Sequence, residues 1–291
     1  FSLLTLTGTD RSHASTDFAF FCRRVEQLQE PDRHFSLSAD EIRLMNPNTG
    51  TCPIFRSQRD AEINKVIYRR VPVLIREGTP EENPWGIGFL RMLDMANDSG
   101  LFRTREQLEA DGWSLDGNRF RQGDRTYLPL YEAKMVHHFD HRFGTYEGQT
   151  DSQANQSKLP ELEEAQHADP RRVCLPRYWV PAEKVEERIQ GRSEREWLLG
   201  WRDVCRNTDT RTLIASFIPR AGVGDKFLLM FPTAAEHRHA TCLLANLNSH
   251  VLDYCARQKI GGTALKYFIM RQLPYSLLRP TTKNRLGAKL N

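Results

Sequence analysis

Three charged residues near the middle of the chain have the types and order of a metal-dependent nuclease site. Asp124 is followed by Glu132 and then by Lys134. Two carboxylates can hold Mg²⁺ while a lysine assists the attacking water molecule. The pattern is short and arises often by chance, so a Mg²⁺-dependent nuclease is kept as an alternative hypothesis. It requires the three side chains to cluster in the folded protein.

The stretch 131–142 (YEAKMVHHFDHR) mixes aromatic, basic and imidazole side chains. Such a mixture suits contact with a nucleic-acid backbone or stacking on bases. The structural alternative is buried hydrogen bonding by Glu132 and Asp140. The candidate DNA contacts of this stretch are Lys134, His137 and Arg142.

A second group of candidates consists of arginines between positions 202 and 220. Guanidinium groups match guanine edges and phosphates, and Arg202, Arg206 and Arg211 are the candidate contacts. An ion pair of Asp209 with Arg211 that fixes a turn is an equally good interpretation.

A third group surrounds two consecutive glycines after an amphipathic helix. Glycines at 261 and 262 allow a sharp turn and a close approach to a phosphate, with N–H groups offered beside Lys259. A glycine helix cap without a ligand is the alternative. The candidate contacts here are Lys259, Gly261, Gly262, Thr263 and Lys266.

Charge is distributed unevenly along the chain. The net charge is +4, but the last acidic residue is Asp253, and eight Lys and Arg follow from Tyr254 onward. The first 253 residues hold 33 basic and 37 acidic residues. This polarity favours a polyanion partner, although basic C-terminal tails are common in other proteins.

Four segments resemble, in this order, the region that follows the catalytic domain in large adenine-N6 DNA methyltransferases. The methyltransferases concerned are those of type IIG restriction systems and of the BREX and DISARM defence systems. The segments are residues 51–57 (TCPIFRS) with the helix after them, residues 131–142, residues 208–224 and residues 257–274. The last segment is also similar to the ends of target-recognition domains in type I specificity subunits.

The resemblance implies a DNA-reading part of a larger protein. In that family an N-terminal methyltransferase domain carries catalysis and S-adenosylmethionine, and the C-terminal part reads double-stranded DNA. The chain lacks the Pro-Pro pair of the family's catalytic motif, and Asn83-Pro-Trp85 is a near miss. We therefore expect no catalytic residue and no cofactor in this chain, with the missing domain and duplex DNA as partners. A protein-interaction module of a defence complex is a further alternative, marked by an exposed apolar patch.

Local signals predict the elements that would position these residues. Capping boxes at Ser38 and Thr104 begin helices, and an amphipathic helix covers about 57–70. Strands are expected near 119–122, 127–131, 197–205, 212–218 and 227–231, and one long helix over about 237–258. The irregular alternation predicts an α+β fold with mostly antiparallel sheets and flanking helices, resembling type I and IIG target-recognition domains.

Composition suggests two lobes. The polar stretch 147–172 is expected to be a flexible linker between a first recognition lobe (24–146) and a second (173–291), and residues 1–23 to be a hairpin left from a preceding methyltransferase domain. Scattered cysteines favour reduced thiols in a cytoplasm. No apolar run is long enough to span a membrane.

Overall fold

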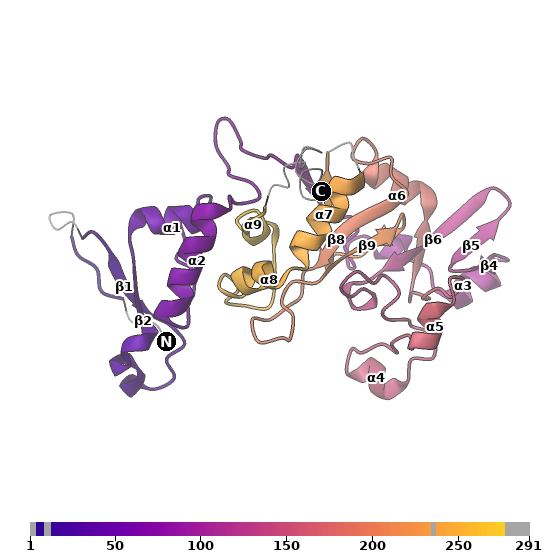
Figure 1. The fold of residues 1–291 in the computed structure, drawn as a ribbon. Helices are drawn as coiled ribbons and strands as arrows, with labels where there is room; N and C mark the ends of the chain where they lie inside the picture. Colours follow the sequence, from indigo (N-terminus) through magenta and orange to yellow (C-terminus); the bar gives the residue numbers. More distant parts are fainter. Residues whose placement is uncertain (1–3, 9–12, 234–236, 277–291) are drawn as a thin grey trace, which may run out of the picture. The chain divides into compact units, whose positions relative to one another are not determined.

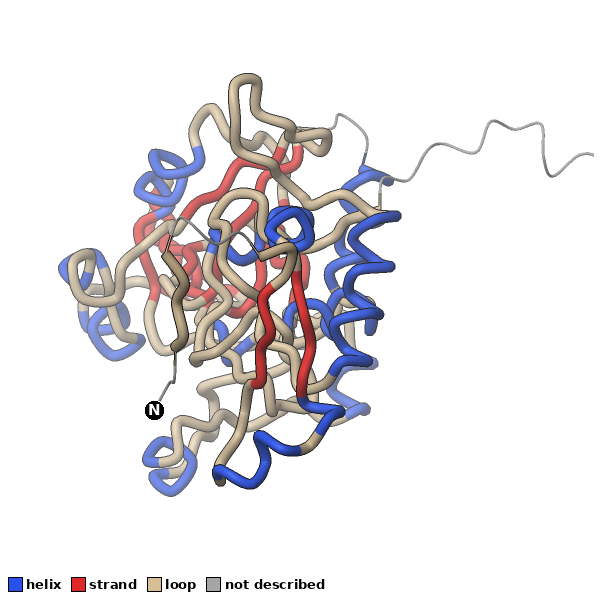
Figure 2. The backbone as a smooth tube through the Cα atoms, turned by 90° about the vertical axis from the view of Figure 1, so that its left-hand side faces the viewer, coloured by secondary structure: helices blue, strands red, loops and turns tan. Residues whose placement is uncertain are grey.

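The structure is a computed structural model that describes residues 4–8, 13–233 and 237–276. It shows an α+β protein with mostly antiparallel strand pairs, which confirms the predicted fold class (Figure 1). Loops make up much of the backbone path between short helices and strands (Figure 2). The chain divides into two compact units: unit 1 holds the residues up to Glu82 with Phe268–Ser276, and unit 2 holds Asn83–Tyr267.

Unit 1 combines a two-stranded antiparallel sheet with short helices. Phe18 lies opposite Phe35 across the strand pair, and the Phe35 ring meets the Phe55 ring edge-on at 5.2 Å. Ser38 and Ser57 each accept a hydrogen bond from the first turn of a helix, which confirms both predicted helix starts. The elements are β1 (Thr16–Ala19), η1 (Val25–Gln29), η2 (Pro31–Arg33), β2 (His34–Leu37), α1 (Ala39–Met45) and α2 (Gln58–Arg70).

A segment from the far end of the sequence completes unit 1. It follows α9 (Tyr267–Met270), and the backbone of Pro274 pairs with that of Val73. Tyr68 donates its hydroxyl proton to the Gln272 carbonyl at 3.0 Å, and Gln272 Oε1 accepts from Asn48 N at 3.0 Å. Unit 1 is therefore closed by residues some 200 positions away from most of it.

Unit 2 contains two sheets. The first has the order β10-β6-β5-β4, with β7 also paired to β6; only the β10–β6 pair is parallel. The second is antiparallel throughout, in the order β3-β11-β8-β9. The strands are β3 (Ile87–Leu90), β4 (Ser114–Asp116), β5 (Arg119–Gln122), β6 (Arg125–Tyr131), β7 (Trp179–Pro181), β8 (Trp197–Arg202), β9 (Ala215–Pro219), β10 (Gly222–Val223) and β11 (Phe227–Pro232).

One hydrophobic cluster joins the two sheets of unit 2. It includes Leu128 and Leu130 of β6, Leu198 of β8, and Leu229 and Phe231 of β11. The surrounding helices are η3 (Ser99–Leu101), α3 (Arg105–Ala110), η4 (Ala133–Met135), α4 (Asp151–Asn155), α5 (Glu164–Ala168), α6 (Ala182–Ile189), α7 (His237–Leu247) and α8 (His250–Arg257).

The expected long helix over 237–258 is wrong, because two helices occupy that range. Asn248 separates them: its Nδ2 donates to the Ala215 carbonyl at 2.9 Å, and its Oδ1 accepts from Ala215 N at 3.0 Å. Ser249 then begins α8 by accepting from Leu252 N. A long-range contact with β9 thus breaks a pattern that is continuous in the sequence.

The expected flexible linker over 147–172 is also wrong. This segment carries α4 and α5 and buries Leu159 and Leu162 in the core of unit 2. Glu161 pairs with Gly144 in a backbone bridge. These contacts dock the segment, although its average composition is polar. The compact units of the chain do not follow the lobes 24–146 and 173–291.

The expected hairpin within residues 1–23 is not formed. β1 pairs with β2, and residues 4–8 form no strand in the part of the chain that the structure describes. Residues 1–3 and 9–12 lie outside the described residues. Pairing with a strand that comes after two 3₁₀ helices is a non-local choice that the composition of the first segment does not signal.

A buried carboxylate holds the loop before β9 against α8. Asp253 is 4% exposed and accepts from Thr212 N and Leu213 N, both at 2.8 Å. Its other oxygen pairs with Arg257 Nε at 2.9 Å. The Arg257 guanidinium also donates to the carbonyls of Asn207, Asp209 and Thr210.

We expect Asp253→Ala to lower the free energy of unfolding by about 3–5 kcal/mol, because it leaves two backbone amides without their acceptor and a partly buried guanidinium without its carboxylate partner. Asp253→Asn should lose less, since it keeps one acceptor oxygen. Urea unfolding measures both. Glu187→Ala, which removes an exposed carboxylate on α6, is the control; equal losses in the control and Asp253→Ala would contradict the assignment.

In unit 1, His34 is expected to titrate above its ordinary pKa. Its Nδ1 lies 2.7 Å from Asp17 Oδ2 and its Nε2 2.8 Å from the Leu28 carbonyl, and these two contacts raise the pKa of His34 above 6.5. The stabilisation is fully present below pH 6.5 and is lost as the pH rises through the raised pKa. An NMR titration should show this pKa fall towards 6.5 in Asp17→Asn, and an unchanged value would refute the role of Asp17.

Candidate nucleic-acid interface

Three segments that are distant in sequence meet in unit 2. Arg202, at the end of β8, donates from Nε to the carbonyls of Ala133 and Val136 at 3.0 and 2.8 Å. Val204 pairs with Ala264 in a backbone bridge, and Cys205 N donates to the Thr263 carbonyl at 3.1 Å. The stretches 131–142, 202–212 and 257–266, which carry the sequence candidates, are therefore neighbours.

Arg202 holds two segments of the protein together and is not an exposed residue available to DNA. Its guanidinium also covers the Phe143 ring at 5.7 Å. Burial lowers the pKa of Arg202 to about 10, so the side chain stays charged at neutral pH. Its two carbonyl acceptors tie the end of β8 to the turn η4 and to the stretch that follows it.

The Arg142 side chain is also occupied by hydrogen bonds to backbone carbonyls. Its guanidinium donates to the carbonyls of His167, Asp169 and Arg172 at 2.8 to 3.0 Å. These acceptors lie in the segment expected to be a linker, so Arg142 is one reason that the segment is docked. The prediction that Arg142 contacts DNA directly does not agree with this arrangement.

Arg211 and Lys266 serve buried groups. Arg211 Nη2 donates to the Asn248 carbonyl at 2.6 Å, and its Nε lies 3.6 Å from Asp253 Oδ1. Lys266 Nζ pairs at 2.5 Å with Oδ2 of Asp203, a residue only 1% exposed. Both cations balance buried carboxylates, although the Lys266 side chain is itself 47% exposed.

Lys259 and the glycine pair differ in their exposure to solvent. Burial lowers the pKa of Lys259 well below its usual range, so this amine is not an exposed phosphate contact. Gly261, Gly262 and Thr263 are exposed. A Cβ added at Gly262 would meet nothing within 4 Å, so packing alone does not require a glycine there.

A small cavity lies beside Arg202. Its volume is about 330 Å³, and its lining includes Lys134, Arg202, Val204, Asp225 and Lys226. Lys134 Nζ is 3.8 Å from Glu132 Oε2 and 4.9 Å from the centre of the Tyr146 ring. The Lys226 ammonium, 53% exposed, pairs with Asp225, whose Oδ1 is buried without a hydrogen-bond partner. Sequence analysis missed Lys226, because a lone lysine in a turn carries no signal.

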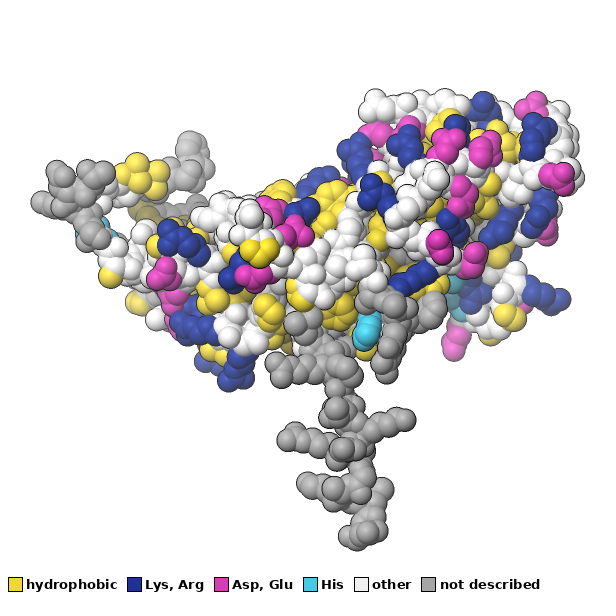
Figure 3. Space-filling model, turned by 90° about the horizontal axis from the view of Figure 1, so that it is seen from above, with side chains coloured by type: hydrophobic (Ala, Val, Ile, Leu, Met, Phe, Trp, Pro, Cys, Tyr) yellow, Lys and Arg dark blue, Asp and Glu magenta, His cyan; other side chains and the backbone are white. Residues whose placement is uncertain are grey.

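The half-buried Lys134 and several exposed residues near it form one surface, which we call the 134–263 surface. It consists of Lys134 and Lys226 at the cavity, Val204 (54% exposed) between the segments, Arg206, and the Gly261–Thr263 turn. Arg206 is exposed, and its backbone N–H, not its guanidinium, donates to Asp209 Oδ2. On the face seen in Figure 3, Lys and Arg are interspersed with Asp and Glu, so this face carries no large area of a single charge sign.

His137 lies in a tight turn beside this surface. Its ring packs on Phe143 at 4.6 Å, and its N–H donates to the Asp140 carbonyl at 2.7 Å. Burial first, and Arg202 second, lower its pKa below 6.5. The His137 side chain is therefore a neutral aromatic ring at pH 7 and not a cation.

The nuclease pattern is not assembled. Asp124 lies in the turn before β6 and Glu132 follows the end of that strand. At roughly 3.3 Å per residue, the intervening strand separates them by about 25 Å. Within the residues that the structure describes, no three His, Cys, Asp or Glu side chains are gathered to hold a metal ion.

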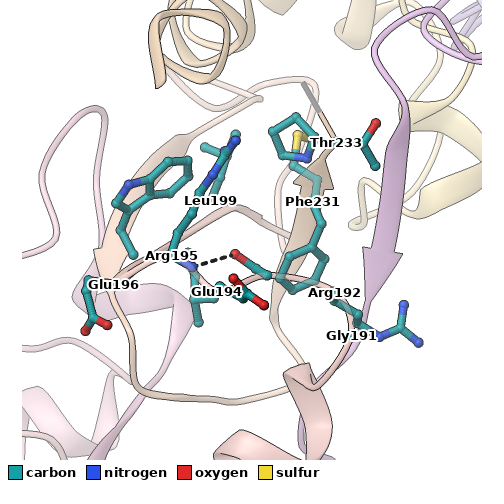
Figure 4. Close-up of a pocket in the computed structure, with 13 residues that line it drawn as sticks. Gly191, Arg192, Glu194, Arg195, Glu196, Leu199, Phe231 and Thr233 are labelled. Carbon is teal, nitrogen blue, oxygen red and sulfur yellow. Dashed lines mark hydrogen bonds between the residues drawn. The ribbon is translucent and has the colours of Figure 1, made fainter. Parts of the chain in front are cut away.

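A larger cavity, of about 760 Å³, lies elsewhere in unit 2 between the stretches 191–199 and 230–233 (Figure 4). Arg195 covers the Trp197 ring at 4.7 Å, and its backbone N–H donates to Ser193 Oγ at 3.2 Å. The two carboxylates of its lining, Glu194 and Glu196, are exposed. None of the sequence candidates lines this cavity, and its residues suggest no particular chemistry.

The basic C-terminal stretch is only partly described. Within it, Arg257, Lys266 and Arg271 form ion pairs with acidic side chains, and Lys259 is half-buried. The other four Lys and Arg lie beyond Ser276, outside the described residues.

Comparison with models of known protein families, with curated proteins and with solved structures finds no match to this chain. No helix in the described part of the chain is long and apolar enough to cross a membrane.

We expect Arg142→Ala to lower the free energy of unfolding by about 2–3 kcal/mol, because it strips three carbonyls of a charged donor. Amide hydrogen exchange should rise in 137–143 and in 163–172. Urea unfolding and exchange mass spectrometry measure these effects. Arg171→Ala, at a side chain that is 91% exposed, is the matched control and should change neither; exchange that rises equally in both variants would contradict the role of Arg142.

Proposed function

We propose that this chain is the DNA-reading part of an adenine-N6 DNA methyltransferase of the restriction or phage-defence type. The observation that supports the proposal best is that two of the four family-like segments, 131–142 and 257–274, meet the stretch 202–206 at the 134–263 surface. A third, 208–224, contacts both of them, because Phe139 N donates to the Ala215 carbonyl and Arg257 donates to the Asp209 carbonyl. The fourth, residues 51–57, lies in unit 1 at the start of α2. Segments that resemble a recognition region and also meet in space are what a shared binding surface requires.

The groups on the 134–263 surface suit contact with a duplex backbone. Arg206, Lys134 and Lys226 offer cationic ends, and the Gly261–Thr263 turn offers N–H groups without side-chain obstruction. Contacts of this kind supply the part of the affinity that is independent of sequence and fix the register of the protein on DNA. Reading of base edges would then fall to side chains placed by the same loops.

The proposal revises the role of several candidates. Arg142, Arg202 and Arg211 become positioning residues that hold the loops in place. Lys266 becomes the partner of the buried Asp203, and Lys259 an amine whose pKa is lowered by burial. Direct contact stays with Lys134, Arg206 and the Gly261–Thr263 turn, joined by Lys226. In the intact protein a separate methyltransferase domain, with S-adenosylmethionine, would flip the adenine and transfer the methyl group.

Two other functions are less well supported. A Mg²⁺ nuclease would need Asp124 and Glu132 together, and β6 holds them apart. A protein-interaction module would use exposed apolar side chains, of which Phe139 and Val204 are examples in unit 2. Val204 lines the small cavity together with Lys134 and Lys226, which favours a polyanion over a purely apolar partner.

The test is binding of a labelled random-sequence duplex by the chain, measured by fluorescence anisotropy between about 50 and about 200 mM salt. We expect affinity to fall steeply with salt. Arg206→Ala should weaken binding at every sequence and reduce the slope of log K against log salt by about 1.

Two variants make this test specific. Gly262→Ala should fold normally, because its Cβ enters open space, yet weaken binding if the turn approaches a phosphate. Arg192→Ala removes an exposed guanidinium from the lining of the larger cavity and should leave binding unchanged. No binding at low salt, or an equal loss of DNA affinity in Arg192→Ala and Arg206→Ala, would count against the proposal. Mg²⁺-dependent cleavage of the duplex would support the nuclease hypothesis instead.

A further inference from the structure

Phe139 is an exposed aromatic residue in a turn beside the 134–263 surface. Its 62% exposure is the highest among the large hydrophobic side chains described in unit 2. Its φ of +57° lies in the left-handed region, which bulky L-residues rarely adopt. The exposure of the ring to water and the left-handed backbone conformation both lower the stability of this turn. Other interactions must therefore hold the turn in place.

The turn is fixed by hydrogen bonds to its backbone and to its neighbouring side chains. His137 and Asp140 exchange backbone hydrogen bonds at 2.7 and 3.1 Å, which closes a two-residue turn with Phe139 in it. Phe139 N donates to the Ala215 carbonyl at 3.3 Å, and His138 Nε2 donates to the Leu213 carbonyl at 2.9 Å.

The Asp140 side chain completes this fixation. Its Oδ1 accepts from Arg142 N at 2.7 Å, and its Oδ2 lies 3.0 Å from His167 Nε2. The turn is therefore anchored on both sides, to the start of β9 and to the segment 163–172. A strained residue persists only where its surroundings over-determine it, and such residues cluster at functional sites.

The surroundings of the ring favour a nucleic acid. Both oxygens of Asp140 are used within the protein. Burial, with help from Arg202 and Arg211, lowers the pKa values of His137 and His138, so both imidazoles are neutral at pH 7. Phe139 thus follows two imidazoles that are uncharged at pH 7, and Arg202 and Arg211 lie near enough to both imidazoles to lower their pKa values.

We propose that Phe139 is a wedge that inserts its ring between stacked bases of duplex DNA bound at the 134–263 surface. This inference rests on the proposed function and extends it, because it adds deformation of the duplex to backbone contact. Apolar side chains inserted at a base step unstack it and kink the duplex, and an aromatic ring can stack on the exposed base face. A rigid turn suits this role, because a mobile side chain would fold back onto the protein.

The test compares two labelled duplexes of the same random sequence, one fully paired and one with a central mismatch, both bound by the full 291-residue chain at low salt. The mismatched step is already weakly stacked, so we expect about 5- to 20-fold tighter binding to that duplex. A 2-aminopurine beside the mismatch should brighten on binding, because the inserted ring displaces its stacking partner.

Two substitutions assign the effect to the ring. Phe139→Asn removes the ring but tolerates positive φ, so it should fold at least as well, bind both duplexes equally and leave 2-aminopurine dark. Phe139→Trp should keep the preference. Equal thermal unfolding of the variants and wild type establishes that folding is intact.

The outcomes separate the wedge from the proposed function. Salt-dependent binding by the wild type without preference for the mismatch, or a preference that survives in Phe139→Asn, overturns the wedge and leaves DNA binding in place. No binding of either duplex overturns both and points to a protein partner at Phe139. Loss of the preference in Phe139→Asn alone supports the wedge.

Discussion

Guanidinium groups donate hydrogen bonds to many backbone carbonyls in the long loops of unit 2. Arg142 serves three carbonyls, Arg257 serves three with the Asp253 carboxylate, and Arg202 serves two. Arg220 donates to the carbonyls of Ser193 and Arg195 in the 191–199 loop and pairs with the Glu186 carboxylate of α6. A buried carbonyl without a donor is costly, so these arginines hold the irregular half of the unit in one conformation.

This constraint also shapes the candidate interface. The arginine and Asp140 contacts hold the turn at Phe139 and the end of β8, while the exposed groups of the 134–263 surface stay free of core packing. When the backbone beneath the exposed contacts is already rigid, less conformational entropy of the protein is lost on binding a duplex. Under the proposed function, such a rigid surface would orient the bound duplex.

Some arginines of unit 2 bind backbone carbonyls and others are exposed. This difference explains why the sequence did not show which arginines between positions 202 and 220 could contact DNA. A guanidinium has five donors in a planar fork, and carbonyl oxygens accept from it much as phosphate oxygens do. Arg202 and Arg206 are therefore equivalent in sequence terms, although one is half-buried beneath a loop and the other is exposed. The same ambiguity applies to Lys266, whose partner, Asp203, lies far from it in sequence.

The sequence by itself determined the local features: the capped starts of helices at Ser38, Ser57 and Thr104, most strands of unit 2, and the α+β class. These depend on interactions within a few residues, which composition and spacing record. Only the tertiary structure decided the pairing of β1 with β2, the break at Asn248, the docking of 147–172, the return of 268–276 to unit 1, and which cations remain exposed. Each of these depends on contacts between distant residues, for which a single sequence gives the groups but not their partners.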